Sequence, residues 1–159
     1  AVRARLEALE LESYLKTTGG KGLHVVVPLA AGKQDWAQVK AFSHAVALEF
    51  VDAAPELFIA TASKAGRRGK IFLDYLRNGR GATSVAPYSL RARPGAPASV
   101  PIRWDELARL PGSDKYTLAN LAARLRRMRA DPWQDMVEPT RQFLRAAVLR
   151  AVGVKRGAK

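Results

Sequence analysis

The chain has 159 residues, a formal net charge of +13, 48% hydrophobic residues and no cysteine. This length suits a single domain, and the hydrophobic fraction excludes a chain that is disordered for want of a core. The absence of cysteine excludes disulfides, thiol catalysis and thiolate metal sites. The longest apolar run, residues 25–31, is far shorter than the roughly 20 residues that cross a bilayer, so we expect a cytoplasmic protein with no membrane partner.

The first expected element is a helix at the very start of the chain. Val2, Leu6 and Leu9 recur there at helical spacing, and no capping residue precedes them. Because a helix that begins without a cap is typical of a cut chain, we expect these residues to be part of a longer protein.

The middle of the chain predicts strands and one long helix. Strands at residues 13–16 and 23–29 flank a glycine-rich turn and predict a hairpin. An amphipathic helix is expected over residues 35–54, where a proline ends it. Alternation over residues 71–76 predicts a core strand from which Asp74 projects between two apolar neighbours.

The last third of the chain predicts mainly helices. Prolines and small residues over 91–101 indicate an extended connection and a possible edge strand, with no domain boundary. We expect helices at 104–110, 117–128 and 141–152, followed by a basic tail.

A strip of basic residues favours a polyanionic partner, because phosphates attract it without sequence readout. Its only acid is Asp74, and a solvated basic face is the alternative interpretation. The nine basic residues of this strip are Lys64, Arg67, Arg68, Lys70, Arg77, Arg80, Arg91, Arg93 and Arg103.

The turn at residues 17–22 has the sequence Thr-Thr-Gly-Gly-Lys-Gly, which can present backbone N–H groups and Lys21 to a phosphate. It is not a Walker A loop, because it leads into a strand. Thr18 and His24 stand six residues apart and can flank one bound group. The alternatives are an ordinary turn and a core histidine; His44 is interpreted as structural, and no histidine pair has zinc-ligand spacing.

Asp74 is the best single candidate for chemistry. A carboxylate on a core strand needs a cation, which is either a metal ion or an arginine such as Arg77 or Arg80. One carboxylate is too few for two-metal phosphoryl transfer, and the sequence contains no Asp-x-Asp.

Taken together, residues 17–29, 71–78 with 80–83, and 86–89 with 91–97 strongly resemble the polymerase domain of bacterial ATP-dependent DNA ligase D. That domain belongs to the archaeo-eukaryotic primase superfamily. The likeness runs from the start of the chain to Asp131-Pro132-Trp133. It implies an α+β, primase-polymerase-like fold with a mainly antiparallel sheet flanked by helices, incomplete at its N-terminal side. Residues 1–135 are then the C-terminal portion of the domain, and 136–159 a helical basic tail.

The resemblance implies a template-directed nucleotidyltransferase that fills DNA ends in non-homologous end joining. Its implied partners are DNA ends with a template strand, nucleoside triphosphates, ligase and nuclease domains of the same polypeptide, and a DNA-end-binding protein. Asp74 maps to a catalytic ligand of Mg²⁺ or Mn²⁺. The nucleotide-binding candidates are Thr18, Lys21, His24, Arg67 and Arg77.

The family's Asp-x-Asp motif is missing from this chain. We therefore expect the two-metal site to be completed by residues absent from the chain, and the chain alone to be inactive. The alternative is a catalytically inactive fragment that binds nucleotide or DNA.

Overall fold

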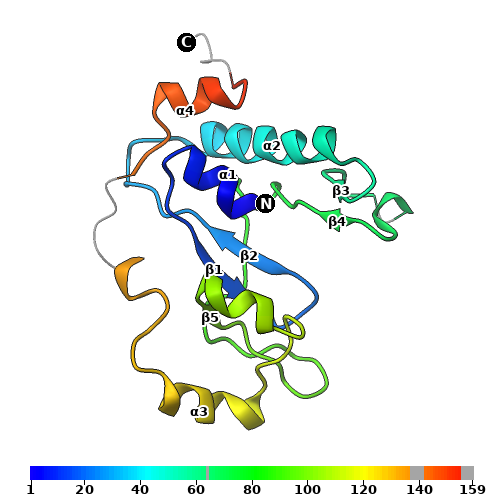
Figure 1. Cartoon of the computed structure of the whole chain (residues 1–159), viewed down its shortest axis with the longest axis vertical. Helices are drawn as coiled ribbons and strands as arrows, with labels where there is room; N and C mark the ends of the chain where they lie inside the picture. The colour runs from blue at the N-terminus through cyan, green and yellow to red at the C-terminus, as the bar shows by residue number, and fades with distance from the viewer. Residues whose placement is uncertain (64, 137–141, 155–159) are drawn as a thin grey trace. The chain divides into compact units, whose positions relative to one another are not determined.

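The computed structural model describes residues 1–63, 65–136 and 142–154. The chain divides into two compact units, each built from two stretches far apart in the sequence (Figure 1). The first unit joins Ala1–Pro28 to Val85–Gln142, and the second joins Leu29–Ser84 to Phe143–Lys159. The expectation of a single domain from length stays a prediction, because a division into compact units is not a division into domains. The predicted border at residues 135/136 stays a prediction.

The first unit contains a three-stranded antiparallel sheet in the order β2-β1-β5. The hairpin of β1 (Tyr14–Thr17) and β2 (Leu23–Val26) is confirmed, with Tyr14 opposite Val26 and Thr17 opposite Leu23. β2 ends earlier than expected; Pro28, just beyond it, has no N–H for a ladder. On its other side β1 pairs with β5 (Pro101–Ile102).

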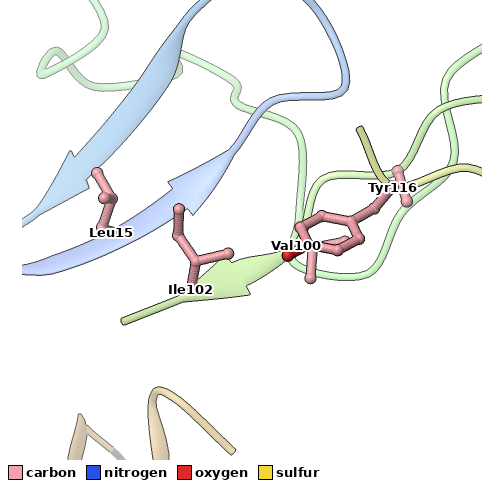
Figure 2. Close-up of a cluster of buried hydrophobic side chains, with 5 residues drawn as sticks. Leu15, Val100, Ile102 and Tyr116 are labelled. Atoms are coloured by element: carbon pink, nitrogen blue, oxygen red, sulfur yellow. The ribbon is translucent and has the colours of Figure 1, made fainter. Parts of the chain in front are cut away.

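The segment that leads into β5 is part of the core. Ala98 and Val100 are fully buried and cluster with Leu15, Ile102 and Tyr116 (Figure 2). The prediction of an extended connection with a possible edge strand is confirmed at this end, because β5 forms one edge of the sheet and residues 97–101 are buried. Burial of alternate apolar residues outweighs the turn-forming composition of the segment.

The helices of the first unit begin with α1 (Val2–Ala8), whose N-cap Ala1 makes no side-chain cap bond. Residues 104–110 were expected to be helical, and they form the 3₁₀ helix η2 (Trp104–Arg109). The expected helix after Thr117 is confirmed as α3 (Leu118–Arg127), with the Thr117 N–H bonded to Asn120 Oδ1 at 2.9 Å. A short 3₁₀ helix, η3 (Gln134–Met136), follows.

The second unit is built on α2 (Trp36–Ala53), which confirms the long helix expected over residues 35–54. Asp35 and Gln38 form a capping box: Asp35 Oδ1 accepts the Gln38 N–H at 2.7 Å, and Gln38 Oε1 accepts the Asp35 N–H at 3.1 Å. β3 (Phe58–Ile59) pairs in parallel with β4 (Ile71–Phe72).

Two short helices complete the described part of this unit. The 3₁₀ helix η1 (Ala65–Arg67) lies between β3 and β4 in sequence, and α4 is formed by Ala146–Ala151. The last helix is shorter than the expected range of residues 141–152, because residues 142–145 are not helical. Residue 141 and nearly all of the basic tail lie outside the described residues. In the described ranges, no helix is long and apolar enough to cross a membrane.

The prediction of a core strand over residues 71–76 is wrong. β4 has two residues, and Ile71 is 60% exposed. The ladder stops because β3 offers only two residues to pair with. Beyond it the chain turns, and Asp74 Oδ1 accepts the Leu76 N–H at 3.1 Å. Asp74 is thus an exposed turn residue and not a core carboxylate.

Candidate functional site

The glycine-rich turn between β1 and β2 is closed by the hydroxyl of Thr18. Thr18 Oγ1 donates to the Gly22 carbonyl at 2.7 Å and accepts the Gly20 N–H at 3.2 Å. Gly19 has a φ of +64°, which favours glycine. In the described part of the chain, the N–H groups of Lys21 and Gly22 have no hydrogen-bond acceptor. The turn therefore offers two exposed donors and the Lys21 ammonium to an anion.

Ser113 secures this turn, although nothing in its sequence context pointed to it. Its hydroxyl accepts the Thr18 N–H at 2.8 Å and makes a short bond to the Gly22 carbonyl. Its own carbonyl accepts the Gly19 N–H at 3.1 Å. Ser113 is 5% exposed, so these bonds are shielded from water. Because Ser113 lies 95 residues beyond Thr18, only the fold brings the two together.

Two arginines of the basic strip lie against the turn. A Cβ on Gly19 would lie 2.8 Å from Cγ of Arg91, and a Cβ on Gly20 would lie 3.2 Å from Nη1 of Arg93. Sequence reasoning counted Arg91 and Arg93 only as part of a general basic strip. The structure adds both to the cationic surroundings of the turn.

His24 lies in β2 directly opposite Lys16 of β1. Directly paired residues project to the same face of a sheet, so Lys16 and His24 share one side, and Thr18 follows directly after the end of β1. Lys16 is 3% exposed, and its Nζ donates to the Val85 carbonyl at 2.6 Å and to Ser99 Oγ at 2.8 Å. Burial, and secondly the charge of Arg91, lower the pKa of Lys16 to about 8. Sequence reasoning missed Lys16, because a single lysine in a strand matches no motif.

The remaining candidates lie in the second unit. Asp74 Oδ2 is 3.7 Å from Nε of Arg77, and the side chains are 39% exposed for Asp74 and 62% for Arg77. Arg77 also donates from Nη1 to the Thr83 carbonyl at 2.8 Å. Arg77, one of the arginines predicted as a partner of Asp74, forms a loose exposed pair with it, and the role of Asp74 as a metal ligand stays a prediction.

Arg67 packs its guanidinium on the ring of Phe72, with Cζ 3.6 Å from the ring centroid. Its Nε is buried and has no hydrogen-bond partner among the described residues. A buried donor without an acceptor is costly, so Arg67 has the chemistry to meet an anion. His44 stacks on Tyr75 with centroids 3.9 Å apart, which supports its interpretation as a structural residue.

The six predicted site residues thus fall into two sets. Thr18, Lys21 and His24 belong to the first compact unit, whereas Arg67, Asp74 and Arg77 belong to the second. The first set lies on the hairpin of β1 and β2. The second set lies on the segment that runs from η1 through β4 to the turn after it. Lys64, at the start of the basic strip, lies outside the described residues.

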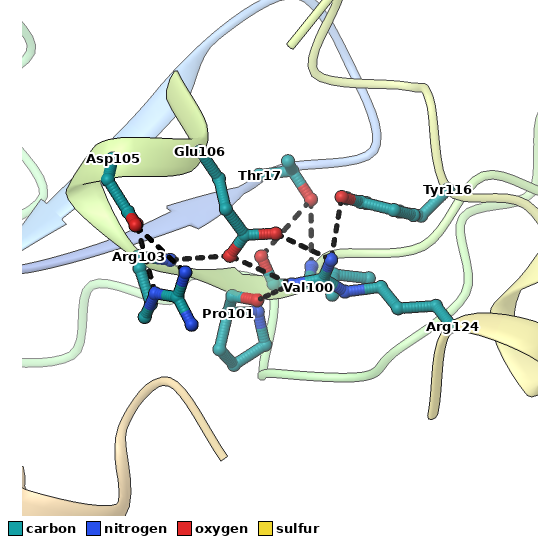
Figure 3. Close-up of polar contacts among 8 residues, drawn as sticks. All are labelled: Thr17, Val100, Pro101, Arg103, Asp105, Glu106, Tyr116 and Arg124. Atoms are coloured by element: carbon teal, nitrogen blue, oxygen red, sulfur yellow. Dashed lines mark hydrogen bonds and ion pairs between the residues drawn. The ribbon is translucent and has the colours of Figure 1, made fainter. Parts of the chain in front are cut away.

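Not every charge near the sheet is available to a ligand (Figure 3). Arg124 Nη1 pairs with Glu106 Oε1 at 2.7 Å and donates to the Tyr116 hydroxyl at 2.8 Å. Burial raises the pKa of Glu106, but bonds from Arg124 and from the Arg103 N–H outweigh it, so that the pKa lies below its usual value. Arg103, the last residue of the basic strip, is paired with Asp105 at 2.8 Å.

Comparison with known proteins identifies the family of this chain. Residues 1–133 match the model of the family described as LigD, primase-polymerase domain. The chain belongs to this family. The LigD resemblance deduced from the motifs is thereby confirmed.

Curated LigD relatives agree with this assignment. The chain is 45% identical over 149 residues to the Multifunctional non-homologous end joining protein LigD of Pseudomonas aeruginosa, covering 93% of this chain and 18% of that protein. It is 42% identical over 107 residues to the LigD protein of Mycolicibacterium smegmatis, covering 67% of this chain and 14% of that protein. The chain therefore spans less than a fifth of the length of either relative.

A solved structure confirms the α+β fold class with its antiparallel sheet and helices. It is the Polymerase Domain from Mycobacterium tuberculosis Ligase D in complex with DNA, with a TM-score of 0.75 and 30% identity. The match covers 84% of this chain and 46% of that one.

Proposed function

We propose that this LigD-family chain acts as part of a template-directed nucleotidyltransferase that fills or extends DNA ends during non-homologous end joining. The observation that carries the proposal is the match of residues 1–133 to the LigD primase-polymerase family. The reaction joins the 3′-oxygen of a primer to the α-phosphorus of a nucleoside triphosphate. Pyrophosphate leaves, and the hydroxyl proton passes to solvent or to a nearby base.

The turn between β1 and β2 is the proposed grip on the triphosphate. The N–H groups of Lys21 and Gly22, which lack acceptors in the described structure, suit phosphate oxygens. His24, Arg91 and Arg93 add donors and positive charge beside them. Thr18 shapes the turn in this proposal, since its hydroxyl hydrogen goes to the Gly22 carbonyl.

Arg67 and Arg77 are proposed as phosphate-binding residues on the chemistry of their own side chains. The unpartnered Nε of Arg67 supports this role, because a phosphate oxygen would satisfy it. Such groups bind and orient the triphosphate and neutralise charge that develops on the leaving pyrophosphate.

A Mg²⁺ or Mn²⁺ pair is the group that the family implies, and the donor set does not fit it. The described residues contain no group of three or more His, Asp or Glu side chains that can hold a metal. Asp74 is one exposed carboxylate already close to Arg77. We propose Asp74 as the single metal ligand of this chain, with the other ligands lying outside these 159 residues.

A second candidate function is a nucleotide- or DNA-binding fragment without catalytic activity. The missing Asp-x-Asp favours it, because two-metal catalysis needs several carboxylate oxygens to hold both ions. The two candidates share the triphosphate grip and differ only in turnover.

Primer extension tests both candidates. The 159-residue chain is assayed on a primed template with Mn²⁺ and nucleoside triphosphates, with and without a segment carrying Asp-x-Asp supplied in trans or fused. We expect extension only when that segment is present. Robust extension by the chain alone that Asp74→Ala abolishes would contradict the absence of a complete metal site. Failure to bind any triphosphate would reject both candidates.

DNA ends with a template strand, ligase and nuclease domains of the same polypeptide, and a DNA-end-binding protein are the proposed partners, in the bacterial cytoplasm. The Mycobacterium tuberculosis polymerase domain was solved in complex with DNA, and the Pseudomonas aeruginosa relative is called multifunctional. Both facts about these relatives support the proposal for this chain.

A further inference from the structure

Lys16 is a buried cation whose described bonding partners are neutral. Its Nζ donates to the carbonyl of Val85 and to the hydroxyl of Ser99, and the residue is 3% exposed. An ammonium removed from water is costly unless a negative charge lies nearby. The neutral oxygens satisfy its hydrogen bonds but leave its charge uncompensated.

A second cation increases this cost. The charge of Arg91 acts on Lys16 and opposes its protonation. Within the described ranges, no carboxylate forms an ion pair with Lys16 or Arg91. Two positive groups therefore lie close together, and the described structure contains no anion to balance them.

The turn between β1 and β2 is where an anion can provide that balance. Lys16 lies opposite His24 on the same face of the sheet, and it stands two residues before Thr18 in the chain. The side chain of Arg91 lies against Gly19 of this turn, with its Cγ 2.8 Å from the position that a Cβ on Gly19 would take. A phosphate held by the turn would thus lie near both uncompensated cations.

We propose that Lys16 is a positioning residue for the triphosphate site, where its buried ammonium ties Val85 and Ser99 to β1 and supplies charge that a phosphate bound at the turn neutralises. Lys16 does not touch the phosphate, because it is buried. Ser99 carries its influence to the turn, since Ser99 Oγ donates to the Thr17 carbonyl at 2.8 Å. This inference rests on the proposed nucleotide binding at the turn.

A proton linkage follows from this placement. The pKa of Lys16 is lowered to about 8 by burial and then by Arg91, and a bound anion raises it again. Triphosphate binding near this pH therefore takes up a proton, and affinity falls as the pH rises through 8. The facing groups are His24 on β2, the guanidinium of Arg91, and Tyr14 earlier on β1. Burial raises the pKa of Tyr14, so it titrates above this window.

The test uses ATP as the probe, with calorimetric titrations from about pH 7.5 to about pH 9.5 in buffers of different ionisation enthalpy. Lys16→Met removes the charge, and Lys16→Arg makes it permanent. Lys115→Met is the matched control, because Lys115 is an exposed lysine of the same unit. We expect Lys16→Met to bind ATP about tenfold more weakly at the lower pH, the size of a unit charge acting through a partly screened distance.

The pH profile separates this role from a purely structural one. Wild type and Lys115→Met should lose affinity as the pH rises and take up a proton on binding, whereas both Lys16 variants should be insensitive to pH. Equal affinity of Lys16→Met and wild type, or a wild-type pH profile that persists in Lys16→Arg, overturns the proposal. If Lys16→Met does not fold, absence of proton uptake by the wild type overturns it. If the wild type binds no ATP, the proposed function itself fails.

Discussion

Thr18 has two hydrogen bonds inside the turn that compete with the phosphate contact expected from its motif. It donates to the Gly22 carbonyl and accepts the Gly20 N–H. His24 lies on the adjoining strand β2, opposite Lys16. We therefore expect the two members of the motif to differ, with Thr18 shaping the turn and His24 contacting the triphosphate.

Alanine substitutions distinguish these roles. His24→Ala should weaken triphosphate binding by about 1.5–3 kcal/mol, the value of a charge-assisted bond, with little change in melting temperature. Thr18→Ala should lower the free energy of unfolding by about 0.5–1.5 kcal/mol through the lost turn bonds and weaken binding as well. Thermal melts and ATP titrations on the same samples measure both effects. A lower melting temperature with unchanged affinity in His24→Ala would show that His24 is structural.

Gly19 is a position that tolerates no side chain. Its φ is +64°, and an added Cβ would meet Arg91 Cγ at 2.8 Å and the Pro97 carbonyl oxygen at 3.0 Å. We expect Gly19→Ala to destabilise the protein by about 1–2 kcal/mol from the left-handed backbone alone. Gly22→Ala is the control, because nothing lies within 4 Å of its Cβ position. Urea unfolding measures both, and equal stabilities would contradict the crowding at Gly19.

At the level of elements, the ion pair between Arg124 and Glu106 ties α3 to η2. Arg124 also donates to the Tyr116 hydroxyl and, at 3.1 Å, to the carbonyl of Pro101 in β5. One guanidinium thus links a helix, a 3₁₀ helix and the sheet (Figure 3). Removal of its carboxylate partner leaves a half-buried charge unpaired.

Glu106→Gln should lower the free energy of unfolding by about 1–3 kcal/mol for this reason. The pKa of Glu106 is lowered in the folded protein, so its contribution is present above the unfolded pKa and is lost as the pH falls through the folded pKa. Wild type should therefore lose more stability than Glu106→Gln on acidification. Asp105→Asn is the control, because its pair with Arg103 is exposed. Equal losses of stability on acidification in wild type, Glu106→Gln and Asp105→Asn would contradict this role of Glu106.

At the scale of the whole molecule, the positive residues behind the net charge of +13 differ in whether a carboxylate pairs with them. Arg103 is paired with Asp105, whereas Arg68 is exposed and has no ion-pair partner among the described residues. Unpaired arginines release counterions from DNA when they bind phosphates, whereas paired ones contribute less.

We expect DNA affinity to fall at least about tenfold between roughly 50 and 200 mM salt and to depend little on base sequence. Arg68→Gln should reduce the slope of log affinity against log salt by about one, and Arg103→Gln should leave it nearly unchanged. Fluorescence anisotropy over a salt series measures the slopes. A flat salt dependence, or strong preference for one sequence, would show that the basic strip is misinterpreted.

The sequence by itself determined those helices and strands that are specified by residues close together along the chain. The capped helix α2, the hairpin of β1 and β2, and the start of α3 after Thr117 were predictable, because capping, proline and alternation act over a few residues. The LigD family was also determined by the sequence alone, since its motifs are contiguous stretches.

Tertiary structure alone decided which distant residues meet at the site. Ser113 and Arg91 reach the turn from segments far along the chain, and the bonding of Lys16 depends on Val85 and Ser99. The alternation of apolar residues predicted a core strand that includes Asp74. The length of a strand also depends on the strand that pairs with it, and β3 pairs with only two residues of β4. Hydrogen-bond partners and charge neighbours are set by packing across the fold, so no local pattern in the sequence contains them.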